Sequence, residues 1–206
     1  QPMFEVGDGV SATFQMVKVD GNSGAITQGD STTYNILVHD TGVLNVGDGA
    51  RIYNAYSYTV YMTGTAGLNV SQSFEPTDID DEGDERYGMQ INAYSQSSAV
   101  PYGIALAGEN HVVNLSGSAV IGNTNAAGDI TGTPATGVYA FTLLSDAEVT
   151  LNMQGSSRVQ AGNIFYLEGK SATDDWLNIK TRPPFGCRAP PPFTSCAMHV
   201  LMCSAV

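Results

Sequence analysis

The stretch Gly29-Asp30-Ser31-Thr32, followed closely by His39-Asp40, has the residue types of a hydrolytic centre. A serine, a histidine and an aspartate together form the usual nucleophilic triad. Gly-Asp-Ser also begins a serine-protease motif that continues with Gly and a lipase motif that continues with Leu. Thr32 breaks both motifs, and a Gly-Asp-Ser turn is ordinary in a chain rich in tight turns. The sequence therefore predicts no catalytic role for Ser31.

Asp174 and Asp175, with Asp146 upstream, are the candidate carboxylates for glycoside hydrolysis. That reaction needs two carboxyl groups at a suitable separation. Pectin hydrolases built on β-helices also carry Gly-His-Gly and Arg-x-Lys, and neither occurs here; His111 lies between Asn and Val. Arg158 is the mid-chain candidate for the base of a polysaccharide lyase. We expect Asp174-Asp175 to form a solvated turn and Arg158 to be a surface charge.

The acidic run 78–85 is the candidate calcium loop, because calcium prefers several oxygen ligands. An EF-hand would need a bidentate Glu at the twelfth position, which is Met89 here. The default prediction is a solvated loop, with a looser calcium site as the alternative. The candidate binding-loop residues are Asp78, Asp80, Asp81, Glu82 and Asp84.

No other metal or cofactor site is predicted. The three His residues are scattered, and Cys187, Cys196 and Cys203 lack the spacing of a zinc site. The four tyrosines Tyr53, Tyr56, Tyr58 and Tyr61 could stack on sugars, but packing between strands is the simpler interpretation.

Composition points to short strands joined by turns. Hydrophobic residues make up 42% of the 206 residues, which is enough for a core. Charged residues are 14%, against about 25% in ordinary domains, and there are 23 Gly. The net charge of −12 disfavours nucleic acid and anionic membranes as partners. No apolar stretch is long enough for a membrane helix.

An apolar-Asn-apolar triplet recurs five times. The central Asn residues are 24, 45, 38 and 26 residues apart, and we take each step as one or two coils of a solenoid with roughly 20–25 residues per coil. Because neighbouring side chains of a strand point to opposite faces, the apolar pair should be buried and the Asn should face away. The triplets are Leu44-Asn45-Val46, Leu68-Asn69-Val70, Val113-Asn114-Leu115, Leu151-Asn152-Met153 and Leu177-Asn178-Ile179.

These triplets belong to a longer repeat: a strand led by Tyr, a turn, the triplet strand, a turn of small residues and a short strand. We expect an all-β, single-stranded parallel β-helix of seven or eight coils over residues 1–180, with loop excursions near 72–101 and 122–136. Residues 12–19 are predicted as one half-buried strand. Gly7-Asp8-Gly9 and Gly47-Asp48-Gly49 are predicted as equivalent turns of successive coils.

Residues 181–206 differ from the rest. They contain all three Cys, five of the nine Pro and no Asp or Glu. We interpret them as an irregular C-terminal tail outside the fold, arising from a frame shift or cloning artefact, with a natural linker as the alternative.

The Cys-free, acidic repeats over 34–54, 58–70, 102–123 and 139–179 resemble the passenger domains of bacterial autotransporters, the type V secretion family that includes pertactin-like adhesins. The resemblance implies a right-handed β-helix on the surface of a Gram-negative bacterium or released from it. It also implies a signal peptide and a membrane β-barrel, neither of which is found in this sequence; we therefore expect a fragment. The lack of Cys agrees with export of an unfolded chain through an oxidising periplasm.

The expected function is non-enzymatic: an adhesin or a structural stalk without a cofactor. The expected partners are a host-surface or matrix protein or a glycan, bound through the loops at 72–101 and 122–136. One alternative is a carbohydrate-active β-helix enzyme, such as a phage tailspike or a polysaccharide lyase or hydrolase. A second alternative is a β-sandwich adhesin module.

Overall fold

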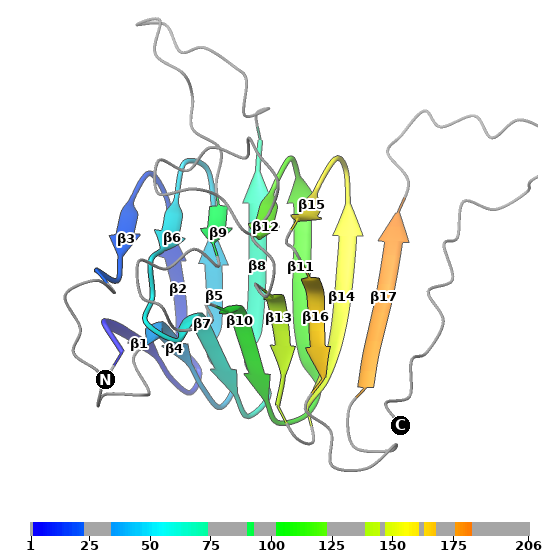
Figure 1. Ribbon diagram of the computed structural model, residues 1–206, viewed down its shortest axis with the longest axis horizontal. Coiled ribbons are helices and arrows are strands. Elements are labelled where there is room, and N and C mark those ends of the chain that lie inside the picture. Colours follow the sequence, from blue (N-terminus) through cyan, green and yellow to red (C-terminus); the bar gives the residue numbers. More distant parts are fainter. Residues whose placement is uncertain are drawn as a thin grey trace, which may run out of the picture.

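The protein is all-β in a computed structural model that describes residues 2–22, 34–73, 90–92, 102–122, 139–144, 147–160, 163–167 and 176–182. These residues contain seventeen strands and no helix, and every strand pairing is parallel. The strands form three sheets, and within each sheet the strands are stacked one after another along a common axis (Figure 1). This arrangement is consistent with a β-solenoid.

Consecutive strands always lie in different sheets. Sheet A contains β1 (Phe4–Val6), β4 (Tyr34–Val38), β7 (Tyr58–Thr63), β10 (Tyr102–Ala107), β13 (Tyr139–Leu143) and β16 (Asn163–Leu167). Sheet B contains β2 (Ser11–Phe14), β5 (Val43–Val46), β8 (Gly67–Gln72), β11 (His111–Gly117), β14 (Glu148–Gln154) and β17 (Trp176–Arg182). Sheet C contains β3 (Lys18–Asp20), β6 (Arg51–Tyr53), β9 (Gln90–Asn92), β12 (Val120–Gly122) and β15 (Arg158–Gln160).

One strand from each sheet in chain order makes a coil. The described residues form five such coils and a sixth that contributes only β16 and β17. The predicted seven or eight coils were therefore too many. Each step between neighbouring triplets, including those of 45 and 38 residues, is a single coil. The longer steps were misinterpreted because they include long polar insertions between strands.

The core consists of columns of aliphatic side chains, one residue from each coil. In sheet C the column is Val19, Ile52, Ile91, Ile121 and Val159, in register. The first four are buried, and Val159 is partly buried against the core. Each coil buries its inner side chains on those of its neighbours, so stability comes from stacking.

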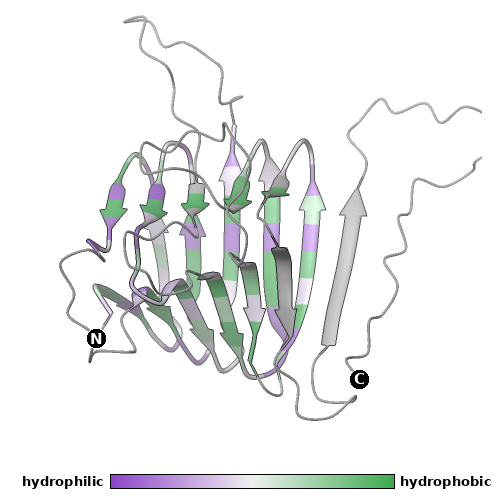
Figure 2. Cartoon of the chain, viewed as in Figure 1, coloured by the Kyte–Doolittle hydropathy of each residue, from purple (hydrophilic) through white to green (hydrophobic). Residues whose placement is uncertain are grey.

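The triplet prediction is confirmed for three triplets. Leu44 and Val46, Leu68 and Val70, and Val113 and Leu115 are buried, while the intervening Asn residues are only partly buried. In the fourth triplet Leu151 is buried but Met153 is half-exposed and packs at the margin of the core. Hydrophobic and hydrophilic residues accordingly alternate along the strands of sheet B (Figure 2).

The fifth triplet does not continue the series. Asn178 pairs with Thr150, whereas Asn152 pairs with Lys180. The alternation of β14 offers two overlapping apolar-polar-apolar sets, and a shift of two residues keeps the same faces. The triplet alone could not distinguish these two registers.

Three boundaries also differ from prediction. Residues 12–19 contain the ends of two strands, β2 and β3, separated by Met16 with a φ of 49°, because the chain turns there from sheet B to sheet C. The excursion at 72–101 includes β9, which pairs with β6 and β12. β17 ends at Arg182, two residues beyond the predicted boundary of the tail.

The two Gly-Asp-Gly turns lie at different corners. Gly7-Asp8-Gly9 connects β1 to β2, between sheets A and B, and the Val10 N–H donates to the Gly7 carbonyl. Gly47-Asp48-Gly49 connects β5 to β6, between sheets B and C. Both turns reverse the chain with the same residue types, so composition could not assign them to corners.

Candidate functional site: a polar groove on sheet B

A ladder of asparagine amides runs across the outer face of sheet B, on the opposite side from the core. Asn45, Asn69, Asn114 and Asn152 are in register on β5, β8, β11 and β14. Each Nδ2 donates to the Oδ1 of the preceding coil, and all three donor–acceptor distances are 2.8 Å. At the N-terminal end, Asn45 Nδ2 donates to Ser11 Oγ at 2.9 Å. The bonds all point the same way along the stack.

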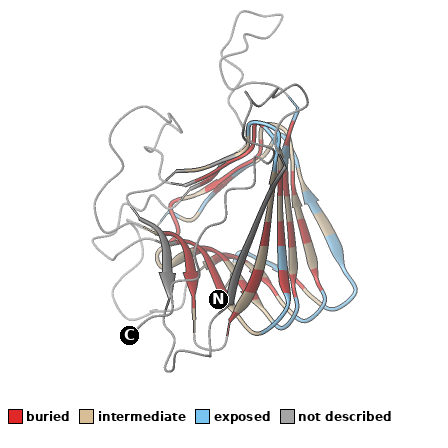
Figure 3. Ribbon diagram, turned by 90° about the vertical axis from the view of Figure 1, so that its right-hand side faces the viewer, coloured by how far each residue is buried: buried red, intermediate tan, exposed pale blue. Residues whose placement is uncertain are grey.

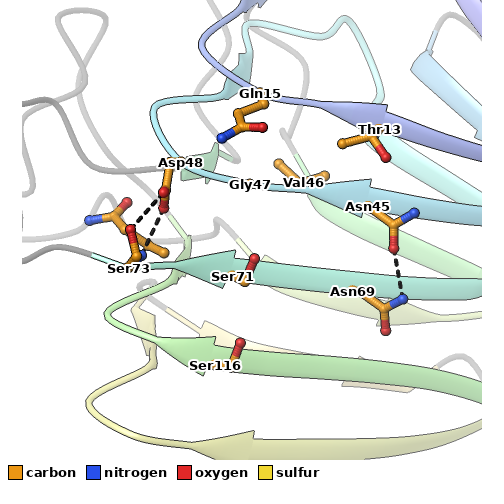
Figure 4. A pocket seen from close by; sticks show the side chains of 11 residues that line it. Thr13, Gln15, Asn45, Val46, Gly47, Asp48, Asn69, Ser71, Ser73 and Ser116 are labelled. Carbon is orange, nitrogen blue, oxygen red and sulfur yellow. Dashed lines mark hydrogen bonds between the residues drawn. The ribbon is translucent and has the colours of Figure 1, made fainter.

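A groove of about 400 Å³ opens beside the N-terminal half of this ladder. Figure 4 shows its side chains arising from β2, β5, β8 and β11 and from the turns that follow them. Most of the residues that line it carry hydroxyl or amide side chains. The residues are Thr13, Gln15, Asn45, Val46, Gly47, Asp48, Asn69, Ser71, Gln72, Ser73 and Ser116.

The single carboxylate in the groove is held by the neighbouring coil. Asp48 Oδ1 accepts the backbone N–H of Ser73 at 2.7 Å, and Asp48 Oδ2 accepts the Ser73 hydroxyl at 2.6 Å (Figure 4). Two short bonds to one carboxylate fix both turns relative to each other. Asp48 therefore forms one rigid end of the groove.

A second polar cluster lies at the corner between sheets A and B. His39 Nε2 lies 3.0 Å from Glu5 Oε1, and His39 Nδ1 lies 2.7 Å from Asp40 Oδ2. The hydrogen bond to Asp40, together with the charges of Asp40 and Glu5, raises the pKa of His39. The ring covers Gly7, where a Cβ would lie 2.9 Å from His39 Cε1. This cluster joins the first coil to the second.

Two further candidates, His111 and Arg158, lie on strands of the described part of the chain. His111 is buried, with Nδ1 3.0 Å from the Ala66 carbonyl and Nε2 3.1 Å from the Ala107 carbonyl. Arg158 begins β15, where it pairs with Val120.

Two of the four candidate tyrosines, Tyr58 and Tyr61, pack on other tyrosine rings. Tyr61 lies 5.1 Å from Tyr34 of the preceding coil and 5.7 Å from Tyr58, measured between ring centroids. Burial raises the pKa of Tyr61. The predicted packing between coils is confirmed for Tyr61, which contacts Tyr34 of the preceding coil.

The other predicted site residues lie outside the described part of the chain. These are Ser31, the binding-loop residues Asp78, Asp80, Asp81, Glu82 and Asp84, the carboxylates Asp146, Asp174 and Asp175, and the three Cys. Within the described ranges no group of three or more His, Cys, Asp or Glu is arranged to hold a metal ion. Nor do these ranges include a helix long and apolar enough to cross a membrane.

The sequence indicated the Asn ladder but not the groove. Ser71 and Ser116 are separated by 45 residues and become neighbours only through the pairing of β8 with β11. The cluster of Glu5 and His39 was missed for the same reason, since it depends on the pairing of β1 with β4.

Comparison with known proteins gives no relative. No protein-family model, no curated protein and no solved structure matches this chain.

Proposed function

We propose that this chain is part of a right-handed, single-stranded parallel β-helix that acts as a non-enzymatic scaffold, and that it belongs to a passenger of the autotransporter type. It is exposed on the surface of a Gram-negative bacterium or secreted from it. Its task is adhesion, or holding other regions away from the cell. Its partners are a host-surface or matrix protein or a glycan, and its own membrane β-barrel domain lies outside this sequence.

The observation that carries the proposal is the unbroken stacking of coils through three parallel sheets. Each coil adds one strand to each sheet, so length can grow without a new core. The described interior is filled by close-packed aliphatic columns. A rod of this kind suits a spacer, and its outer faces supply surfaces for binding.

The pairing of strands tests the architecture. We expect nuclear Overhauser contacts between register partners of neighbouring coils, such as Asn69 on β8 and Asn114 on β11, in a parallel arrangement. Antiparallel contacts between strands that follow one another in the chain would favour a β-sandwich and contradict the β-helix.

Surface display tests the biological role. The chain would be placed between a signal peptide and the membrane β-barrel of an autotransporter in a Gram-negative host. We expect external protease to cleave it on intact cells and the cells to gain adhesion to a host-cell layer or matrix. Retention in the periplasm, or release of sugar fragments from a polysaccharide by the purified chain, would contradict the proposal.

A further inference from the structure

We propose that the groove on sheet B is a binding site for a neutral glycan, which lies across the strands and parallel to the stacking axis. This inference rests on the proposed adhesive function and supplies it with a ligand class and a site. It moves the expected binding surface from the inserted loops to a sheet face.

The chemistry of the lining selects for hydroxyl groups. Ser71, Ser116 and Thr13 bring hydroxyls to the groove, and Asn45, Asn69 and Gln15 bring amides. Such groups both donate and accept, as sugar hydroxyls do. No Lys or Arg is found among the described residues that line the groove. A sulfated or uronic-acid glycan would find no cation there, and the net charge of −12 would repel it.

The ladder amides of the central coils keep unused hydrogen-bonding groups. An asparagine amide carries two N–H donors and an oxygen with two lone pairs. At Asn69 the ladder uses one N–H toward Asn45 and one lone pair for the amide of Asn114. The second N–H and the second lone pair remain for a ligand, and the amide of Asn114 has the same two groups left. At Asn45 both N–H groups are used, toward Ser11 Oγ and the Ala12 carbonyl, so a lone pair remains there.

The repeat of these groups fits an extended chain. Neighbouring strands are about 4.8 Å apart, so equivalent donors and acceptors recur at that interval along the stack. Ser71 and Ser116 form a second row parallel to the ladder, because they are register partners on β8 and β11. A ligand along the axis therefore meets two rows of polar groups.

An apolar strip lies on the other side of the ladder. Val43, Gly67 and Val112 are register partners on β5, β8 and β11. Val112 is 40% exposed, the one large hydrophobic residue of β11 that the structure describes as exposed. Gly67 leaves a gap between the two valines. A pyranose ring presents C–H groups as well as hydroxyls, and this strip supplies a surface for them.

Binding of defined oligosaccharides to the full chain tests the site. The probes are linear neutral hexasaccharides of β-1,4-glucose, β-1,3-glucose, α-1,4-glucose and β-1,4-mannose, with hexagalacturonate as the anionic counterpart. Isothermal titration calorimetry measures affinity. We expect at least one neutral hexasaccharide to bind and hexagalacturonate not to bind. Preference for hexagalacturonate, or no binding of any neutral probe, overturns the inference.

Paired variants locate the site. In the double variant S71A/S116A two groove hydroxyls are lost, and we expect binding to weaken by about tenfold. T63A is the matched control, since Thr63 is a half-buried hydroxyl residue at the end of β7 in sheet A and outside the groove. The control should keep the affinity of the natural chain. Equal affinities for S71A/S116A and the natural chain overturn the assignment to this groove, as does a loss in T63A as large as that in S71A/S116A.

A further comparison separates this inference from the proposed function. Suppose that cells displaying the chain adhere to a host-cell layer and that neither the hexasaccharides nor S71A/S116A changes this adhesion. The proposed function would then hold, and the glycan site would be overturned. Glycan binding by a purified chain that never reaches the cell surface would keep the site and contradict the function.

Discussion

Sheets A and B share one core but differ in how far the residues on their outer faces are buried. On sheet A the outward residues Ala105 and Thr142 are buried, and β13 is buried from Ala140 to Leu143. On sheet B the strands β5 and β8 alternate between buried and half-exposed residues. Figure 3 shows this contrast, with tan and red alternating along the sheet B strands and red predominating on sheet A.

The difference is greatest at β10 and β13, where sheet A is buried on both faces and should resist change on either face. On β4 and β7 the outward residues Leu37 and Tyr61 are half-buried. A sheet with one solvated face can vary that face without loss of the core. The polar groove and the ladder lie on the sheet that has this freedom.

The largest expected effect comes from a charge placed on each outer face. Ala105→Asp should destabilise the fold by about 3 kcal/mol or more, because an isolated carboxylate would be buried on sheet A. Val112→Asp, on the exposed face of sheet B, should change stability by less than about 0.5 kcal/mol. The urea midpoint of each variant, at an unchanged slope, measures the effect. Equal midpoints for the two variants would remove the distinction between the sheets.

A smaller effect tests whether the ladder stabilises sheet B. Asn114→Ala removes two ladder bonds, to Asn69 and from Asn152, and should cost about 1–2 kcal/mol. Asn152→Ala removes the bond to Asn114 and should cost about half as much. Urea unfolding gives both values. A cost for Asn152→Ala that equals or exceeds that for Asn114→Ala would contradict the ladder.

The sequence predicted the outer face of sheet B better than the outer face of sheet A for a physical reason. Apolar and polar residues alternate along a strand only where one face of the sheet is solvated, so the triplet Leu68-Asn69-Val70 could be recognised. β9 was missed because it has one apolar residue, Ile91, between two polar ones. The outer face of sheet A could not be predicted, since small residues such as Ala105 carry no pattern. The groove was missed because its residues meet only once the register between distant strands is known.

The smallest effect lies at the corner that joins the two sheets. The pKa of His39 is raised by its contacts with Asp40 and Glu5, so the protonated ring is favoured in the folded state. Its contribution to stability should be fully present below the ordinary histidine pKa of about 6.5 and should be lost as pH rises through the higher folded value.

The urea midpoint measured between about pH 5.5 and pH 8.5 detects this loss. His39→Gln removes the titrating group and should flatten the profile over that interval. A profile for His39→Gln that matches the natural chain would assign the pH dependence to other groups.

The stacking of coils depends on the register of sheet B across the insertion between β8 and β11. It is tested most directly by a disulfide between Ser71→Cys and Ser116→Cys, with Cys187, Cys196 and Cys203 changed to Ser. Adjacent strands lie about 4.8 Å apart, within the Cα separation that a disulfide spans. Ser71→Cys with Gln154→Cys, two strands apart, is the control. We predict rapid oxidation of the first pair and none of the second; failure of the first pair to oxidise, or equal oxidation of both, would contradict the stacking of coils described here.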